Sequence, residues 1–367
     1  MIYRNVLHFS DYGSPYKGNF ISSLEGLSEK LEELNHNQIF IFPKRTNTRE
    51  WSKDMKIKYN KVYFFTGNFF KDLILLRRII VEQNIDIIHI HFFTAKTLLL
   101  FNCAKKFLNI KVIIHLHGQF PIYKRTKKII MKWLTKKAYF ICCSKSVKKS
   151  FIDSQYNNKV YRIDNAVFFP RLDKYELLNK IDYGIQKNTI TVLIFGYDYL
   201  IKGVDIVIQA ISNIIKQKNI NIKLLISISS NVDSNKNKII KQLGGFPSWI
   251  VIIEPRNDIA SYYNICDIFI SASRSEGLCY ALVEAAYCKT LSIASRIPAQ
   301  SDMKLKYALW FESENIKDLE NKIIEGINIG KYKIQLEEQK KMVIEEYDLR
   351  LWVKKIINIY DSIWVVY

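Results

Sequence analysis

Short apolar runs alternate with longer amphipathic stretches along most of the chain. In the N-terminal half, the apolar runs predict strands at 5–9, 38–42, 86–91, 111–117 and 138–143. Between them, a helical period predicts helices near 20–34, 70–83, 94–108 and 125–137. Since strands and helices alternate in this way in βαβ units, we expect a parallel sheet covered by helices on both faces.

The same alternation returns in the second half of the chain. It predicts strands at 190–196, 222–228, 249–254 and 267–273, and helices near 203–218, 234–244, 257–264 and 279–288. Residues 166–189 lose the periodicity and include Pro170, which is typical of a linker. The sequence thus predicts an α/β protein with two Rossmann-like domains, 1–165 and 190–345, facing each other across a cleft. Open parallel sheets bind ligands at the carboxyl ends of their strands.

Composition narrows the class of protein. With 367 residues, 49% of them hydrophobic, the chain is too apolar for a disordered protein and too long for one ordinary domain. The six cysteines form no CxxC pair, which excludes a disulfide scaffold and a cysteine zinc site, so we expect reduced, mostly buried thiols. The first residues lack the apolar core of a signal peptide, and no apolar run approaches the roughly 18 residues of a spanning helix. We therefore expect a cytoplasmic protein.

Charge is distributed unevenly. The net charge of +20 divides into +17 for residues 1–185 and +3 for residues 186–367. Such a basic half attracts polyanions, which include nucleic acid, anionic lipid and pyrophosphate groups. Nucleic acid is not expected as a partner, because no recognition helix, zinc finger or aromatic platform is evident.

One basic segment also carries apolar residues. Lys124–Lys137 combines lysines and an arginine with an apolar stripe that includes Trp133, the composition of an interfacial helix. The alternative is an ordinary helix packed on the core with a solvated lysine face. The charge of the N-terminal half favours contact with an anionic membrane, which would make the protein peripheral on the inner face of the cell membrane.

Two carboxylates follow the predicted strand 267–273. Glu276 lies in a glycine-containing turn and Glu284 about one turn into the next helix, so both can face a ligand at the helix N-terminus. The backbone amides of Gly277 and Leu278 would offer donors to a phosphate or a hydroxyl. The alternative is a surface helix whose early acidic residues complement the helix dipole.

The segment 257–295 that contains these carboxylates resembles the signature of retaining GT-B glycosyltransferases of the large family 4 group, with an E-x7-E motif. Residues 195–211 resemble that family's strand, glycine turn and Lys-Gly pair. DIIHIH, HLHG, CCSKSVKK and IDNAV follow the family's order in the N-terminal half. The resemblance implies a GT-B fold, an NDP-sugar donor bound mainly by the second domain, and an acceptor bound mainly by the first.

The resemblance also implies roles for individual residues. Glu284 would hold the ribose hydroxyls, Glu276 the hydroxyls of the transferred sugar, and Lys202 the donor diphosphate, while His117 would lie near the reacting sugar. We predict that His117, Lys202 and Glu276 are catalytic. The other predicted donor-binding residues are Gly18, Asn19, Gly196, Arg256, Asn257, Arg274, Gly277, Leu278 and Glu284. In the resembled fold, the last helix, 346–367, crosses back to the N-terminal domain, where it would bury Leu351, Ile356, Ile359 and Trp364.

If this chemistry holds, the donor bond breaks through an oxocarbenium-like state, and the leaving diphosphate can take the acceptor proton. The resemblance implies neither a cofactor nor a metal. His89, His91, His115 and His117 could ligate zinc, but no acidic or cysteine partner lies at metal spacing. We therefore expect these histidines to line a polar cleft.

The resemblance leads us to predict a hexosyltransferase that uses a UDP- or GDP-sugar. Its acceptor would be a glycan, free or linked to polyprenyl pyrophosphate, in the synthesis of a bacterial capsule, O-antigen (lipopolysaccharide) or exopolysaccharide. One departure leaves alternatives open, because Tyr197 replaces the arginine that usually follows Gly196. The lost contact is worth about 1.5–3 kcal/mol unless Arg274 compensates. The alternatives are a catalytically inert GT-B partner subunit and a GT-B nucleotide-sugar epimerase.

Overall fold

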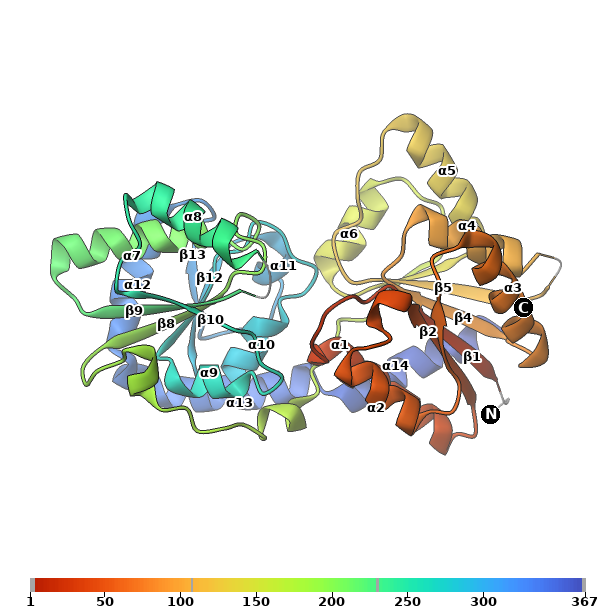
Figure 1. Cartoon of the computed structure of the whole chain (residues 1–367), viewed down its shortest axis with the longest axis horizontal. Helices are drawn as coiled ribbons and strands as arrows, with labels where there is room; N and C mark the ends of the chain where they lie inside the picture. The colour runs from red at the N-terminus through yellow and green to blue at the C-terminus, as the bar shows by residue number, and fades with distance from the viewer. Residues whose placement is uncertain (1–3, 107, 229–230, 365–367) are drawn as a thin grey trace. The chain divides into compact units, whose positions relative to one another are not determined.

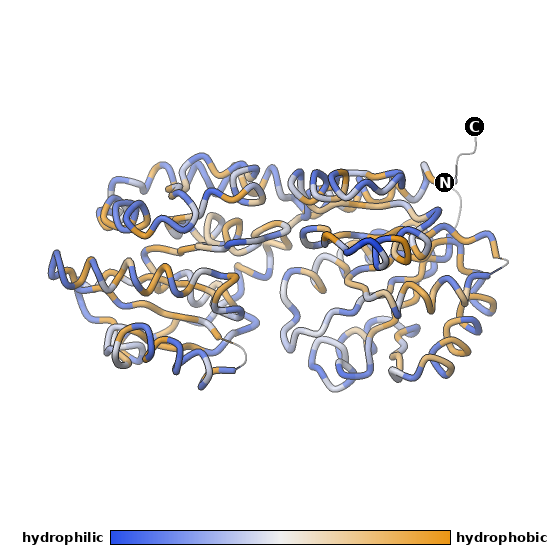
Figure 2. Tube along the Cα trace, turned by 90° about the horizontal axis from the view of Figure 1, so that it is seen from above, coloured by the Kyte–Doolittle hydropathy of each residue, from blue (hydrophilic) through white to orange (hydrophobic). Residues whose placement is uncertain are grey.

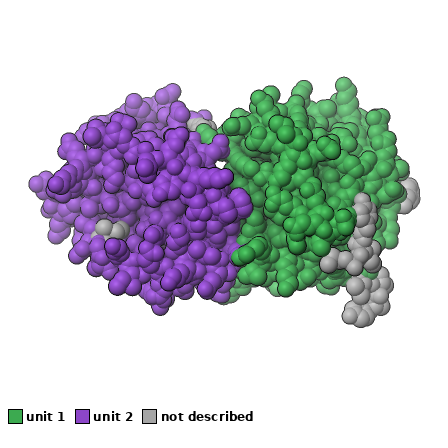
Figure 3. All heavy atoms as spheres, turned by 90° about the horizontal axis from the view of Figure 1, so that it is seen from below, with its two compact units in different colours: residues 1–166, 349–367 green, residues 167–348 purple. Residues whose placement is uncertain are grey.

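The computed structural model describes residues 4–106, 108–228 and 231–364. The chain divides into two compact units (Figure 3). Unit 1 comprises Met1–Ala166 and Leu349–Tyr367, and unit 2 comprises Val167–Asp348. Hydrophobic positions follow the strands, and the helices mix hydrophilic and hydrophobic positions (Figure 2).

Unit 1 contains a seven-stranded sheet in the order β3-β2-β1-β4-β5-β6-β7, and every neighbouring pair is parallel (Figure 1). Its strands are β1 (Asn5–Ser10), β2 (Asn37–Pro43), β3 (Val62–Phe65), β4 (Ile87–His91), β5 (Lys111–Leu116), β6 (Tyr139–Cys142) and β7 (Val160–Arg162). Its helices are α1 (Gly18–Glu33), the 3-10 helix η1 (Lys44–Thr46), α2 (Glu50–Lys58), α3 (Phe69–Glu82), α4 (Ala95–Ala104), α5 (Arg125–Thr135), α6 (Lys145–Asp153) and α14 (Leu349–Ser362).

The last helix, α14, packs with α1 on one face of the unit 1 sheet. The apolar core there joins strand residues such as Val6 and Ile113 to Leu27 of α1 and to Ile356 of α14. Of the four tail residues expected to be buried, Ile356 and Ile359 are buried and Trp364 is partly buried. The expectation for Leu351 is wrong, because its side chain is half exposed.

Unit 2 contains a six-stranded parallel sheet in the order β10-β9-β8-β11-β12-β13. Its strands are β8 (Ile190–Phe195), β9 (Ile222–Ser227), β10 (Ile250–Ile253), β11 (Ile268–Ser271), β12 (Leu291–Ser295) and β13 (Leu309–Phe311). Its α-helices are α7 (Val204–Lys218), α8 (Val232–Leu243), α9 (Ala260–Ile265), α10 (Tyr280–Tyr287), α11 (Pro298–Ser301), α12 (Ile316–Ile327) and α13 (Lys333–Glu346), and its 3-10 helices are η2 (Phe169–Leu172), η3 (Lys180–Tyr183) and η4 (Ile329–Tyr332).

The predicted fold class is confirmed, since both sheets are parallel and Rossmann-like, with the first strand of each unit in the interior of its sheet. In both sheets, the strand order reverses beside that first strand, which places β1 and β8 at the point where such sheets bind ligands. The aperiodic segment 166–189 is more than a tether, because from Val167 on it belongs to unit 2 and forms two short 3-10 helices.

Candidate functional site

The Lys202 loop connects β8 to α7 at the carboxyl end of the unit 2 sheet. Gly203 precedes α7 with φ +66°, a conformation that side chains rarely adopt, and a Cβ there would overlap the carbonyl oxygen of Ala272. The amide of Arg274 donates to the Ile201 carbonyl at 2.8 Å. The glycine therefore lets the Lys202 loop approach the loop that follows β11.

That approach brings Lys202 and Glu276 together. The Lys202 Nζ lies 2.5 Å from Glu276 Oε1, and Ser273 Oγ donates to the same oxygen at 2.7 Å. Both charged side chains are only 11% exposed. Burial alone would lower the pKa of Lys202, but the Glu276 carboxylate and Tyr197 raise it above its usual value. The ammonium group thus stays charged at the carboxyl end of the sheet, where parallel sheets bind ligands.

Tyr197 follows Gly196 at the position where the resembled family has arginine. Its ring centroid lies 4.5 Å from the Lys202 Nζ, so the aromatic face contacts the ammonium group. A Cβ on Gly196 would lie 2.9 Å from Ile226 Cγ2 and 3.0 Å from Val204 Cγ2. Gly196 therefore allows close packing at the end of β8, and the tyrosine adds no second cation.

Glu284 is buried in α10, where Arg171 forms an ion pair with Oε1 and Tyr263 Oη donates to Oε2 at 3.3 Å. Arg171 comes from η2, within the segment predicted as a linker. Tyr287 anchors the same segment by donating to Asp173 at 2.7 Å. Sequence reasoning missed Arg171, and the only available signal was a basic residue beside Pro170 in an aperiodic stretch.

The two residues after Glu276, Gly277 and Leu278, are buried just before α10. The helix begins at Tyr280, and Cys279 occupies its N-cap position. Burial raises the pKa of the Cys279 thiol to about 11, which keeps that side chain neutral beside the charged pair. The E-x7-E segment therefore places one carboxylate before the helix and the other within it.

Two predicted donor-binding arginines already have acidic partners. Arg256 pairs with Asp258 at 2.8 Å and with Glu176 at 2.5 Å, and Asn257 beside it is exposed. Arg274 pairs with Asp205 and with Glu314, at 2.9 and 2.6 Å. Arg274 thus holds the Lys202 loop in place through Asp205 of α7. Because the two carboxylates balance its charge, Arg274 does not replace the arginine that the resembled family has at the position of Tyr197.

In unit 1, one short segment contacts both Asn19 and His117. Asn19 Nδ2 donates to the Ala166 carbonyl at 2.7 Å, and the amide nitrogen of the adjacent Asn165 lies 3.2 Å from His117 Nδ1. Gly18 begins α1 with φ +58°. Burial lowers the pKa of His117 from 6.5 to about 3, so its imidazole is neutral.

The other histidines do not line an open surface. His89, His91 and His115 are fully buried beneath α14, and His8 on β1 joins them. The expected position in a polar cleft is therefore wrong for these three residues. The motif search missed His8 because it lies some 80 positions away along the chain, and only the pairing of β1 with β4 brings it opposite His89.

The basic helix α5 turns apolar residues outward. Met131 and Leu134 are buried, whereas Ile129 and Trp133 are 62% and 63% exposed and Ile130 is also exposed. Four of the six cysteines are buried, as expected, and Cys103 is exposed. Among the described residues, no helix has the length and apolar character needed to cross a bilayer.

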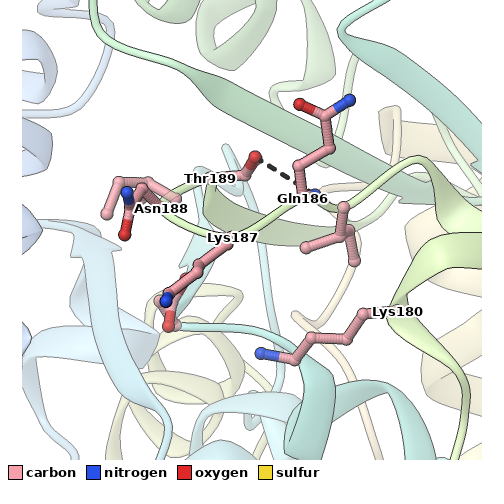
Figure 4. Close-up of a pocket in the computed structure, with 8 residues that line it drawn as sticks. Lys180, Gln186, Lys187, Asn188 and Thr189 are labelled. Atoms are coloured by element: carbon pink, nitrogen blue, oxygen red, sulfur yellow. Dashed lines mark hydrogen bonds between the residues drawn. The ribbon is translucent and has the colours of Figure 1, made fainter.

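A cavity of about 440 Å³ lies elsewhere in unit 2 (Figure 4). It is lined by residues 185–190 together with Lys180 and Asp267, which lie at the amino ends of β8 and β11. None of the predicted site residues lines it. Because ligands of parallel sheets bind at the carboxyl ends, we do not assign this cavity to the donor.

Comparisons with known proteins cover both units. The glycosyl transferases group 1 model matches residues 178–343, and the Glycosyltransferase Family 4 model matches residues 22–168. The uncharacterized glycosyltransferase MJ1178 of Methanocaldococcus jannaschii is 24% identical over 379 residues, which cover 99% of each chain. The Escherichia coli UDP-Gal:alpha-D-GlcNAc-diphosphoundecaprenol alpha-1,3-galactosyltransferase is 26% identical over 242 residues, or 62% of each chain.

A solved structure shares the fold over nearly the whole chain. The crystal structure of Anabaena Alr3699/HepE in complex with UDP and glucose gives a TM-score of 0.80 at 16% identity, and the match covers 98% of this chain and 100% of the other. The fold, the family models and the E-x7-E segment agree. The chain belongs to the GT-B glycosyltransferases of group 1, family 4, and is a retaining enzyme that takes its sugar from a nucleotide-sugar donor.

Proposed function

We propose that the enzyme transfers a hexose from a UDP- or GDP-sugar to a glycan carried on a polyprenyl diphosphate, in the assembly of a bacterial surface polysaccharide. The proposal for the acceptor rests on the basic character of unit 1. No acidic residue occurs between Asp86 and Asp153, and this stretch includes α5. The Escherichia coli relative, whose name gives a UDP-galactose donor and a diphosphoundecaprenol acceptor, supports the same chemistry.

In the proposed donor complex, Lys202 holds the diphosphate and Glu276 the transferred sugar. Lys202 and Glu276 form an ion pair with each other in this structure. The incoming diphosphate would therefore replace part of the negative charge that Glu276 now places beside the Lys202 ammonium group. Glu284 would accept bonds from the ribose hydroxyls. The Arg171 pair supports this role, because it fixes the Glu284 carboxylate in position.

Catalysis in this proposal rests on positioning and charge. The Lys202 ammonium and the backbone before α10 would stabilise the diphosphate as negative charge develops on it. The leaving diphosphate would then take the acceptor proton on the same face of the sugar. His117, which burial keeps neutral, would lie near the reacting sugar, and we assign it no change of protonation.

We also propose that α5 contacts the anionic membrane surface that carries the acceptor. Ile129, Ile130 and Trp133 are exposed on a helix whose first turn contains no acidic residue. Apolar side chains beside lysines favour the boundary between headgroups and acyl chains. Each lysine near an anionic surface adds about 1 kcal/mol, so a few suffice for reversible attachment.

The donor assignment is tested by calorimetric binding of UDP-, GDP-, ADP- and dTDP-sugars, together with slow donor hydrolysis. We expect one nucleotide to bind, with affinity reduced about 10- to 100-fold in Lys202→Ala and in Glu284→Ala. Lys289→Ala is the matched control, because that lysine pairs with Glu337 on the surface. If the folded protein binds no nucleotide-sugar, the transferase proposal fails and the inert partner subunit takes its place. If the protein converts the donor to its epimer without hydrolysis, the epimerase takes its place.

The membrane assignment is tested by sedimentation with vesicles of neutral or anionic lipid. We expect binding to anionic vesicles that weakens with salt and falls in the Ile129→Ser/Trp133→Ser variant. Ile334→Ser is the control, because Ile334 is an apolar residue of unit 2 that is 80% exposed. Equal loss in the control variant, or binding that does not depend on anionic lipid, would contradict the role of α5.

A further inference from the structure

Five histidine rings gather on one face of the unit 1 sheet. His8 of β1 lies opposite His89 of β4, and His91 of β4 lies opposite His115 of β5. Side chains two positions apart on a strand point to the same face, which adds the last ring, His117. The ring centroids of His89 and His91 are 4.0 Å apart, and those of His115 and His117 are 4.3 Å apart.

Three of these residues turn ring nitrogens toward one another. His91, His115 and His117 each offer a ligand atom, and these three atoms lie within 4.8 Å of one another. His91 Nδ1 and His117 Nε2 are 3.0 Å apart. A neutral imidazole keeps one unprotonated ring nitrogen, whose lone pair a metal ion can share.

Several nitrogens of the cluster have no hydrogen-bond partner among the described residues. They include His91 Nε2 and both nitrogens of His115, although the Asn165 side chain lies close enough to His115 to favour its protonated form. Buried polar atoms are normally satisfied, so such a concentration at one place needs a ligand. Neutral imidazole is a preferred ligand of zinc, copper and nickel ions.

We propose that His91, His115 and His117 bind one divalent transition-metal ion of the zinc class at the carboxyl ends of β4 and β5. Three imidazoles would leave a fourth coordination position open. His117 is partly exposed, which gives the ion a route of entry. The other possible trio, His8, His89 and His91, is fully buried, and Tyr360 Oη already bonds His89 Nδ1 at 2.6 Å.

Asn165 would position the ligand His117. Its Oδ1 is buried without a partner, while its amide nitrogen lies 3.2 Å from His117 Nδ1. Turning the amide by 180° would place Oδ1 to accept the proton of His117 Nδ1, which frees Nε2 for the ion. A carbonyl oxygen behind a ligating histidine is the usual supporting contact in such sites. This inference does not depend on the identity of the donor or the acceptor.

Zinc binding to the full-length chain, first stripped with a chelator, tests the proposal. We expect one zinc ion per chain by competition with a chromophoric chelator, and a higher thermal midpoint with zinc. His115→Phe should abolish binding, and Asn165→Ala should weaken it about 10- to 100-fold. His36→Asn is the control, because His36 lies outside the cluster and its Nδ1 only accepts a bond from the Arg4 amide.

His8→Phe separates the two possible trios. It removes one member of the alternative set and keeps an aromatic ring against Phe40, so zinc binding should remain unchanged. Loss of binding in His8→Phe with retention in His115→Phe would overturn the assignment, as would wild-type protein that binds no zinc. Should His115→Phe fail to fold, X-ray absorption of the wild-type zinc complex decides, with three imidazole ligands expected and fewer than two contradicting the site. Donor binding, measured without zinc, remains a separate result.

Discussion

The two units bury polar groups in opposite ways. All six histidines of the chain lie between His8 and His117 in unit 1, and unit 2 contains none. In unit 1, five imidazoles sit together without charge, and the excess of lysine lies mainly on the surface. In unit 2, the nearly neutral half of the chain, two ion pairs are buried at one end of the sheet, Lys202 with Glu276 and Arg171 with Glu284.

This difference suggests what each unit is built to meet. Buried ion pairs gain little stability over apolar packing, so their presence in unit 2 fits groups held ready for a charged ligand. Neutral imidazoles hold hydrogen bonds or a metal ion and remain uncharged at neutral pH. This contrast can be tested with single substitutions. In unit 2 they affect the residues that hold the buried ion pairs in place, and in unit 1 they affect the buried histidines.

The largest effect is expected from Gly203→Ala. An alanine would be strained in the left-handed backbone at position 203 and would clash with the Ala272 carbonyl, so the Lys202 loop would move away from β11. We expect the free energy of unfolding of unit 2 to fall by about 4 kcal/mol, measured by urea denaturation, with loss of donor binding. Gly245→Ala is the control, since nothing lies within 4 Å of its added Cβ, and equal losses in both variants would contradict the role of the close approach.

A smaller effect is expected when one buried ion pair of unit 2 is broken. Arg171→Leu leaves Glu284 buried without its cation, which should cost about 3 kcal/mol of unfolding free energy. Arg256→Leu breaks the pair with the exposed Glu176 and also a contact to Asp258, so it should cost no more than about 1 kcal/mol. Equal costs would show that burial does not distinguish the two arginines.

Acid pH should act on unit 1 before unit 2, because carboxylates of unit 2 with a lowered pKa, such as Asp258, take up protons only below about pH 4. Burial lowers the pKa of His8 from 6.5 to about 3, so below pH 6.5 the unfolded chain binds a proton that the folded chain excludes. Stability is therefore full above pH 6.5 and is lost as the pH falls toward 3, by about 1.4 kcal/mol per pH unit for each such histidine. Hydrogen exchange followed by mass spectrometry should show unit 1 opening first.

The variant His8→Phe measures one of these protons. Between pH 6 and pH 4, this variant should take up about one proton fewer on unfolding than the wild type does. Its free energy of unfolding should therefore depend less steeply on pH. The slope is the readout, because a change in packing shifts stability at every pH alike. An unchanged slope would mean that His8 takes up its proton in the folded state.

Much of the fold could be predicted because buried parallel strands are continuous apolar runs. The interior strands β1, β4, β5, β8 and β9 were all located to within about a residue. Four strands were missed, and three of them, β3, β7 and β13, are edge strands of only three or four residues. β3 is an edge strand of half-buried aromatic residues, and β12, LSIAS, is buried along its whole length but contains two serines, so its hydrophobic signal is low.

The candidate site was predictable where its chemistry is local in sequence. Glu276, Gly277, Leu278 and Glu284 lie within nine positions, and the structure keeps them on one turn and helix. Arg171 and His8 could not be found, because each acts on a partner more than 80 positions away and only the fold brings them together. Likewise, the ion pairs that occupy Arg274 depend on Asp205 and Glu314, which no motif includes.

The smallest change in stability is expected at α5, where it sharpens the contrast between surface and interior in unit 1. Trp133 is 63% exposed, so Trp133→Ser should alter the unfolding free energy by no more than about 0.5 kcal/mol. Leu134→Ser, its buried neighbour on the same helix, should cost several times as much. If both substitutions destabilise the protein equally, Trp133 packs on the core and the membrane role of α5 loses its support. If only Leu134→Ser destabilises the protein, a loss of vesicle binding in Trp133→Ser reflects the missing surface contact and not a change in stability.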